Sequence, residues 1–158
     1  MAAARYYEDF RLGEVFTTGT HVAALGEMVA FARAHDPQSF HTDAAAAAHH
    51  PVFRGLSASG YYTMTVTHRL VLASDPGHAW GLIGKGIDRL RWPRPVRAGD
   101  TLTVRGTVAA LERDPARPYG IVVTDIETLN QRNEVVQSMT VQAVVPVRAA
   151  AVPERRAA

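Results

Sequence analysis

The sequence predicts one α+β domain in which a curved antiparallel sheet packs against a long helix. Three observations lead to this prediction. The 158 residues match the size of a single domain, helical patterns are confined to the first half of the chain, and the second half is a run of β-like stretches. A chain of this length buries roughly 70% of its unfolded surface, so a core can form without disulfides or a structural metal.

The first half of the chain begins with one strand and a short helix. Residues 15–22 are rich in Thr and aromatic side chains, which predicts a strand. Apolar residues recur at helical spacing over residues 27–35, which predicts an amphipathic helix. This helix should end near Asp36, because Pro37 disfavours a helical backbone in the residue before it. We therefore expect residues 36–41 to be irregular.

Two further helices follow. Residues 44–48 are an alanine run that Thr42 or Asp43 can cap, which predicts a short helix. Residues 57–73 form the longest stretch without proline, and their length predicts a helix although several β-branched residues favour a strand. An Asp-Pro-Gly turn is expected at residues 75–77.

The second half of the chain contains four β-like stretches, which predict four strands. The clearest is the last, in which apolar side chains alternate with mostly polar ones. The four predicted strands are residues 80–90, 101–111, 119–129 and 135–147. The domain should therefore span residues 1–147. Residues 148–158 have no pattern in their Ala, Arg and Pro, and we expect them to form a frayed tail.

Composition excludes several classes of function. The chain has no cysteine, which rules out thiol nucleophiles, Cys-based zinc sites and iron–sulfur clusters. Its net charge is only +2 and its basic residues are scattered, so nucleic acid is not an expected partner. No apolar run is long enough to cross a membrane, and the first residues lack the apolar stretch of a signal peptide, so we expect a cytoplasmic protein.

The chemically informative residues are Asp36 and His41. A carboxylate and an imidazole five positions apart on an irregular segment can turn towards one point, where together they can hold a water molecule, remove its proton and return a proton elsewhere. The spacing alone also fits a simpler alternative, in which Asp36 only ends a helix and His41 is a surface residue.

Three separated segments resemble one family, the MaoC-like dehydratases, which include the (R)-specific enoyl-CoA hydratases. HDPQSFHTD at residues 35–43 resembles the hydratase signature, whose usual form is Asp-x-Asn-Pro-Leu-His-x-Asp. GLSASGY at residues 55–61 resembles the opening of the family's long helix, and LRWPRPVRAGDTL at residues 90–102 resembles one of its strands and the turn beside it. With the opening YYEDFRLGEVFTTG, the resemblance spans roughly residues 6–147.

The resemblance implies a hot-dog fold, in which a bent antiparallel sheet wraps around a central helix, here residues 57–73, and it implies at least a homodimer. It places catalysis on Asp36 and His41 and the oxyanion-binding N–H on Gly60. The implied reaction is reversible addition of water to the 2,3 double bond of an acyl-CoA, which needs no cofactor or metal. A glycine at a helix N-terminus suits this role, because it lets a substrate approach the backbone closely and the unpaired N–H groups there stabilise negative charge.

Other residues are candidates for substrate binding, and for each a structural role is also open. Gln38 and Ser39 replace the Asn and Pro that are usual in the signature, which puts substrate range and rate in doubt. Ser59 can either contact the thioester or cap the helix. Arginines near the site can bind the CoA phosphates or be solvated, and Tyr61, Tyr62 and Met64 can line an acyl tunnel or pack in the core. The substrate-binding candidates are Gln38, Phe40, Ser59, Tyr61, Arg91 and Arg94, and the further arginines considered are Arg54, Arg89 and Arg97.

Three alternatives compete with hydration. A hot-dog thioesterase would need a carboxylate on the central helix, but residues 57–73 contain neither Asp nor Glu. A non-catalytic acyl-CoA-binding subunit of a larger dehydratase stays open because Gln38 and Ser39 depart from the signature. A metal site is disfavoured because no His-Glu-x-x-His motif is present. The residues considered for it are His35, Asp36, His41, Asp43, His49 and His50.

Overall fold

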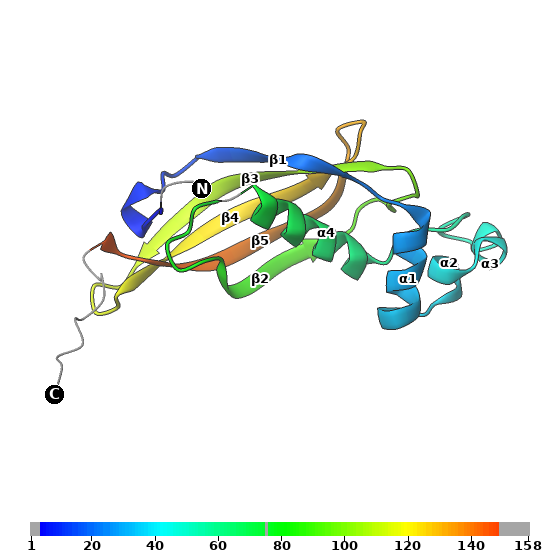
Figure 1. The fold of residues 1–158 in the computed structure, drawn as a ribbon, viewed down its shortest axis with the longest axis horizontal. Helices are drawn as coiled ribbons and strands as arrows, with labels where there is room; N and C mark the ends of the chain where they lie inside the picture. Colours follow the sequence, from blue (N-terminus) through cyan, green and yellow to red (C-terminus); the bar gives the residue numbers. More distant parts are fainter. Residues whose placement is uncertain (1–3, 75, 149–158) are drawn as a thin grey trace.

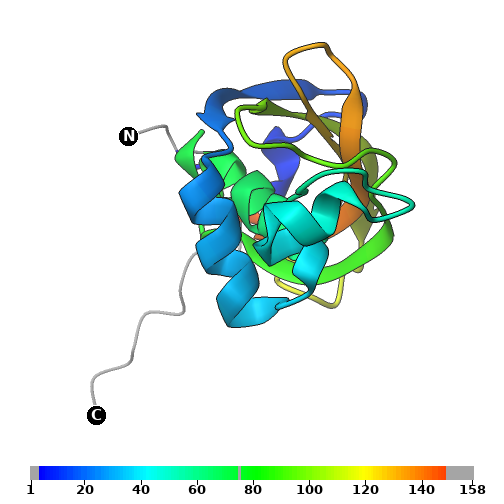
Figure 2. The ribbon, with the colours of Figure 1, turned by 90° about the vertical axis from the view of Figure 1, so that its right-hand side faces the viewer.

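In the computed structural model, which describes residues 4–74 and 76–148, five antiparallel strands form one bent sheet and a long helix lies against it (Figures 1 and 2). The spatial order is β1-β3-β4-β5-β2, so β1 and β2 are the two edges. The strands are β1 (Val15–Val22), β2 (Ile83–Arg91), β3 (Thr101–Arg113), β4 (Tyr119–Leu129) and β5 (Val135–Pro146). The predicted α+β hot-dog arrangement is confirmed.

One of the two largest boundary errors concerns β2, which begins at Ile83 rather than at residue 80. Trp80 instead lies in a turn before the strand. Gly81 has a φ of +77° in this turn, and its N–H donates to the carbonyl of His78 at 2.8 Å. Glycine adopts this left-handed backbone without steric cost, so the turn is fixed by one residue inside an otherwise β-like stretch.

The three shorter α-helices, α1 to α3, gather at one end of the molecule (Figure 1). Asp43 caps α3 as expected, because its carboxylate accepts the N–H groups of Ala45 and Ala46 at 2.8 and 3.1 Å. The long helix begins at Gly60, three residues later than predicted, with Ser59 as its N-cap. The helices are the 3-10 turn η1 (Tyr7–Asp9), α1 (Leu25–His35), α2 (Ser39–Thr42), α3 (Ala44–Ala48) and α4 (Gly60–Ala73).

The prediction that residues 36–41 are irregular was wrong over α2. One helical turn forms there because two local hydrogen bonds close it. The N–H of Asp43 donates to the carbonyl of Ser39 at 2.8 Å, and the hydroxyl of Thr42 donates to the carbonyl of Gln38 at 3.1 Å. This turn carries His41 back towards the end of α1.

Helix α4 forms despite its β-branched residues because it packs as the central element of the core. Its buried face contacts the sheet through Tyr62, Val66 and Leu70, and Leu102 and Val104 of β3 belong to the same buried cluster. The hydroxyls of Thr65 and Thr67 donate to the carbonyls four residues earlier, at 2.9 and 2.8 Å. These bonds satisfy the threonine hydroxyls, and tertiary packing outweighs the weak helix propensity of threonine.

The first and last described residues meet near one end of the sheet. Arg5 forms an isolated β-bridge with His78. The guanidinium of Arg148, the first residue of the predicted tail, donates to both carboxylate oxygens of Asp9 at 2.6 Å. Residues 149–158, the rest of that tail, and Asp75 in the predicted turn lie outside the described residues.

No helix among residues 4–74 and 76–148 is long and apolar enough to cross a membrane.

Candidate active site

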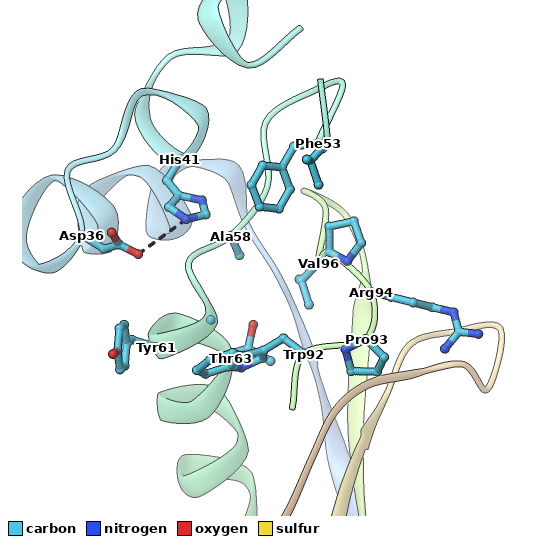
Figure 3. A pocket seen from close by; sticks show the side chains of 13 residues that line it. Asp36, His41, Phe53, Ala58, Tyr61, Thr63, Trp92, Pro93, Arg94 and Val96 are labelled. Atoms are coloured by element: carbon cyan, nitrogen blue, oxygen red, sulfur yellow. Dashed lines mark ion pairs between the residues drawn. The ribbon is translucent and has the colours of Figure 1, made fainter. Parts of the chain in front are cut away.

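A cavity of about 410 Å³ lies at the N-terminal end of α4 (Figure 3). Four parts of the chain line it, one of which is the pair Val52 and Phe53 in the segment between α3 and α4. Asp36 and His41 come from the segment after α1, Gly60 and Tyr61 open α4, and residues 92–96 follow β2. The structure therefore brings together the three residues to which the resemblance assigned catalysis.

Backbone hydrogen bonds hold the segment before α4 between its two neighbours. The N–H of Ser57 donates to the carbonyl of Phe40 at 3.2 Å, and the N–H of Ala58 donates to the carbonyl of Val96 at 2.9 Å. These bonds fix where α4 starts relative to α2 and to the loop after β2.

Asp36 and His41 face each other across the mouth of this site, as the dashed line in Figure 3 shows. Asp36 ends α1, and its N–H donates to the carbonyl of Ala32 at 2.8 Å. His41 lies in α2 and is only 5% exposed. Its Nε2 is 3.5 Å from Oδ2 of Asp36. The simpler alternative, a surface histidine, does not fit this burial.

The hydrogen bond at the other nitrogen of His41 determines the tautomer of its neutral ring. Nδ1 lies 2.8 Å from the carbonyl oxygen of Ser57, and a carbonyl can only accept, so Nδ1 carries the hydrogen. In the neutral ring Nε2 then has a free lone pair that points towards Asp36. His41 can therefore accept a proton on the side that faces the cavity.

Two side chains donate hydrogen bonds to the carboxylate of Asp36. Ser59 Oγ donates to Oδ2 and Gln38 Nε2 donates to Oδ1, both at 2.7 Å. Burial acts to raise the pKa of Asp36, but the bonds from Ser59 and Gln38 and the charge of protonated His41 outweigh it, so the pKa is lowered. Asp36 is thus ionised at neutral pH, and it is a weaker base than a free carboxylate.

Gly60 is the first residue of α4, so its N–H has no partner within the helix. The sequence predicts that this glycine lets a substrate approach the backbone, but an indole occupies the space beside its Cα. A Cβ at this position would lie 2.6 Å from the ring of Trp92. The glycine is therefore required by the packing of Trp92 against the start of the helix.

Trp92 is the main residue of this site that sequence reasoning missed. It lines the cavity, its Nε1 donates to Oε1 of Gln137 at 2.9 Å, and its ring meets the edge of Tyr61 at a centroid distance of 5.9 Å. The available signal was a large aromatic residue inside the segment at residues 90–102 that resembles the family.

Of the six substrate-binding candidates, Tyr61 and Arg94 line the cavity. Gln38 and Ser59 act on Asp36 instead. Phe40 stacks on Phe53 behind His41, with ring centroids 4.8 Å apart. Arg91 bonds to the carbonyl of Leu90 at the exposed end of β2.

The remaining candidates have structural roles or lie away from the cavity. Arg97 donates to the carbonyls of Phe53, Gly55 and Leu56, so it holds the loop before α4. Tyr62 packs in the core, where burial and the carboxylate of Glu27 raise its pKa to about 12. Met64, Arg54 and Arg89 do not line this cavity.

Within the part of the chain that the structure describes, no three His, Asp or Glu side chains converge in a way that could hold a metal ion.

Comparison with known proteins shows which family this chain belongs to. Residues 11–131 match the family described as MaoC like domain. The MaoC-like dehydratase from Rhodospirillum rubrum has a TM-score of 0.87 and 42% identity, and the match covers 92% of this chain and 99% of that one. The R-hydratase PhaJ1 from Pseudomonas aeruginosa has a TM-score of 0.67 and 27% identity, over 90% of this chain and 86% of that one. The (R)-hydratase from A. caviae involved in PHA biosynthesis has a TM-score of 0.68 and 26% identity. That match covers 89% of this chain and 98% of the hydratase chain. The chain belongs to the MaoC-like domain family.

Proposed function

We propose that this protein is an enoyl-CoA hydratase, or 3-hydroxyacyl-CoA dehydratase in the reverse direction. The observation that carries the proposal is the Asp36–His41 pair, which shares one cavity with the N-terminal end of α4. The similarity to a MaoC-like dehydratase and to two (R)-hydratases supports this class of reaction.

The end of α4 provides the site for the thioester oxygen. As water adds, negative charge moves from the double bond onto this oxygen, and the N–H of Gly60 together with the positive end of the helix dipole stabilises it. Because the indole of Trp92 covers one side of Gly60, the thioester approaches from the side of Asp36 and His41.

His41 and Asp36 divide the proton transfers. A water molecule between them loses a proton to the lone pair of His41 Nε2, and its oxygen bonds to C3 of the acyl chain. Asp36 stabilises the imidazolium that forms, which is the role suited to a carboxylate with a lowered pKa. Nε2 then returns the proton to C2. The sum of these steps is the addition of one water molecule, and their reversal is dehydration.

The departures of the signature from its usual form are compatible with this chemistry. Gln38, which replaces Asn, reaches Oδ1 of Asp36 at 2.7 Å and so helps to orient the carboxylate. Ser39, which replaces Pro, starts the helical turn that carries His41. Arg94 lines the cavity and is our candidate for the CoA phosphates, because a guanidinium fork matches phosphate geometry. We further propose that the enzyme uses no cofactor and acts in the cytoplasm as a homodimer.

One assay separates hydration from its alternatives. The protein is mixed with crotonyl-CoA and with longer enoyl-CoAs, while absorbance of the conjugated thioester and release of free thiol are followed together. We expect the absorbance to fall without thiol release. Thiol release without hydration would identify a thioesterase, and the absence of both signals would favour a non-catalytic acyl-CoA-binding subunit.

The roles of the pair are tested by Asp36→Asn and His41→Ala. Each variant should lower the hydration rate at least about a hundredfold, the usual effect of removing a positioned acid or base. Asp43→Asn is the matched control, because Asp43 only caps α3, and its rate should stay near wild type. Near-native activity of Asp36→Asn or His41→Ala would refute the assigned roles.

A further inference from the structure

Arg97, which follows the cavity-lining residues 92–96, is bonded to three main-chain carbonyl groups. Its guanidinium donates to the carbonyl oxygens of Gly55 and Leu56 at 2.6 and 3.0 Å, and it also donates to that of Phe53. Hydrogen bonds from a charged donor are roughly twice as strong as those between neutral groups. Arg97 does not itself line the active-site cavity, so its side chain is engaged by the backbone rather than available to a substrate there.

The three carbonyls belong to a segment with a strained backbone. Arg54 has a φ of +50°, a left-handed conformation that favours glycine. A non-glycine residue persists in this conformation only where its surroundings hold it. The guanidinium of Arg97 is bonded to the carbonyls of the residues before and after Arg54, so it stabilises this part of the chain.

The strained segment leads directly to the peptide group that orients His41. The carbonyl of Ser57 accepts the Nδ1–H of His41 at 2.8 Å. The N–H of the same peptide group belongs to Ala58 and donates to the carbonyl of Val96 at 2.9 Å. A trans peptide is planar and its C=O and N–H point in opposite directions, so this group joins His41 on one side to Val96 on the other.

Val96 and Arg97 are neighbours, so one short piece of chain holds both the peptide group and the segment before it. Asp100, which is only 7% exposed, fixes this piece. Its carboxylate accepts the N–H of Arg97 at 2.7 Å and the side-chain amide of Gln131 at 2.9 Å. Its carbonyl accepts the N–H of Ala23 at 2.8 Å. Arg97 therefore acts from a turn that is tied to the end of β1 and to the turn between β4 and β5.

We propose that Arg97 is a positioning residue for hydration, which acts through His41 and does not touch the substrate. Its guanidinium holds residues 53–56 in place, and the Ser57 carbonyl that follows them keeps the hydrogen of His41 on Nδ1. The lone pair on Nε2 therefore faces the cavity, as removal of a proton from water requires. Because His41 is the base only in the proposed reaction, the kinetic role of Arg97 rests on the proposed function.

Arg97→Ala should lower kcat for hydration of crotonyl-CoA about a hundredfold, the effect of a small misplacement of a catalytic group. KM should change by less than about threefold, because Arg97 does not line the cavity. Arg113→Ala is the matched control, since the guanidinium of Arg113 also donates to main-chain carbonyls, those of Asp114 and Tyr119 at the far end of β3. Its kcat should equal that of the wild type. An unchanged kcat in Arg97→Ala would overturn the proposal.

The tautomer of His41 gives a readout that does not depend on activity. In imidazole nitrogen NMR spectra, at a pH at which the ring is neutral, the wild type should show a protonated Nδ1 and an unprotonated Nε2. In Arg97→Ala the two nitrogen shifts should approach each other as the tautomers exchange, while circular dichroism stays that of the folded protein. A lower kcat with an unchanged tautomer would mean that Arg97 acts by another route, and it would overturn the proposal.

A conservative variant and chemical rescue test the guanidinium itself. Arg97→Lys keeps the charge but loses the planar fork, so kcat should fall about tenfold, and this variant takes the place of Arg97→Ala in both measurements if the alanine chain does not fold. Wild-type kcat in Arg97→Lys would contradict the need for the fork. Guanidinium chloride, far below the concentrations that unfold proteins, should restore activity to Arg97→Ala but not to Arg97→Lys. No restoration, or equal stimulation by sodium chloride, would contradict the role of the guanidinium.

The NMR measurement separates this role from the proposed reaction. If the wild type hydrates no enoyl-CoA but the tautomer of His41 still depends on Arg97, the positioning of His41 stands while the reaction fails. If the wild type is a hydratase and Arg97→Ala keeps both its kcat and its tautomer, the reaction stands while the positioning role is refuted.

Discussion

The hydroxyl of Ser59 joins the start of α4 to the candidate catalytic pair. Its oxygen accepts the N–H of Tyr61 at 3.3 Å and its hydrogen is donated to Asp36 at 2.7 Å. The same atom therefore caps the helix and lowers the pKa of the carboxylate. Neither function could be assigned from the sequence, which left open whether Ser59 caps the helix or touches the substrate.

Ser59→Ala should raise the pKa of Asp36 towards its ordinary value, because the carboxylate loses one of its two donors. Carbon NMR of the carboxyl group during a pH titration measures this directly. Ser39→Ala, an exposed serine in the same segment, is the control and should leave the titration unchanged. An unchanged pKa in Ser59→Ala would show that the hydrogen bond does not stabilise the charged form.

The same substitution should also change how stability depends on pH. A carboxyl whose pKa is lower in the folded state stabilises the fold above its unfolded value of about 3.9, and this contribution disappears as the pH falls through the folded-state pKa. The difference in unfolding free energy between wild type and Ser59→Ala, measured in urea, should therefore shrink below about pH 3.9. The difference in unfolding free energy that persists at low pH comes from the loss of the helix cap and should be about 1 kcal/mol.

Gly60→Ala should destabilise the protein, because the new Cβ would lie 2.6 Å from the indole of Trp92. Overpacking of this kind costs about 1–3 kcal/mol. Gly26→Ala is a matched control, since that glycine also opens a helix but has no neighbouring atom within 4 Å of the place that a Cβ would take, and it should be neutral or slightly stabilising. Urea unfolding measures the stability of both variants. Equal stabilities would contradict the close contact between Gly60 and Trp92.

At the scale of elements, a buried polar chain ties α4 to the sheet. Gln137 of β5 is fully buried, accepts the indole N–H of Trp92 at 2.9 Å and donates to the hydroxyl of Thr67 at 3.0 Å. That hydroxyl also bonds to Thr128 of β4. The chain thus links the loop after β2, the central helix and two strands.

Gln137→Leu should cost about 1–3 kcal/mol of stability, because it leaves the indole N–H of Trp92 without its partner. Adding Trp92→Phe to it should restore part of the loss, so the two changes should not be additive in a double-mutant cycle measured by urea unfolding. Gln142→Leu, on the same strand but bonded at the surface to Asp88, should change stability by no more than about 0.5 kcal/mol. Full additivity would mean that Trp92 and Gln137 do not interact.

Local patterns predicted most of the regular elements, and the resemblance to the family singled out the candidate catalytic pair. Contacts between distant segments could not be predicted from either. Alternation of apolar residues predicted β5, and length predicted α4. The turn α2 was missed because it depends on the particular hydrogen bonds of Thr42 and Asp43. Trp92 was missed as a lining residue because its position depends on Gln137, forty-five residues away.

At the scale of the whole molecule, the edge strand β2 is the expected dimer contact. It pairs only with β5, and its free edge exposes apolar side chains, with Ile83 at 43% and Ile87 at 49%. Trp80 and Leu72, 47% and 48% exposed, lie in the neighbouring turn and at the end of α4. An exposed apolar edge of this kind is a template for pairing with a second chain.

If the protein forms the proposed dimer, Ile87→Lys should convert it to a monomer, because the substitution places a charge in the expected contact. Val15→Lys makes the same kind of change on β1, the opposite edge, where Val15 is 56% exposed, and it should leave the dimer intact. Size-exclusion chromatography with light scattering gives the mass of each species. A monomeric wild-type protein, or a dimer that survives Ile87→Lys, would rule out this interface.

The order of strands has a consequence for how the chain folds during its synthesis. Strand β2 leaves the ribosome before β3, β4 and β5, yet its sheet neighbour is β5, the last of them. Until Val135–Pro146 has emerged, β2 has no strand to pair with and one side of α4 stays uncovered. Pairing between such distant segments is slow, and domains complete their folding only when their last element is available. A nascent chain that ends before residue 135 should therefore expose apolar surface that chaperones recognise, and its release should coincide with translation of the final strand.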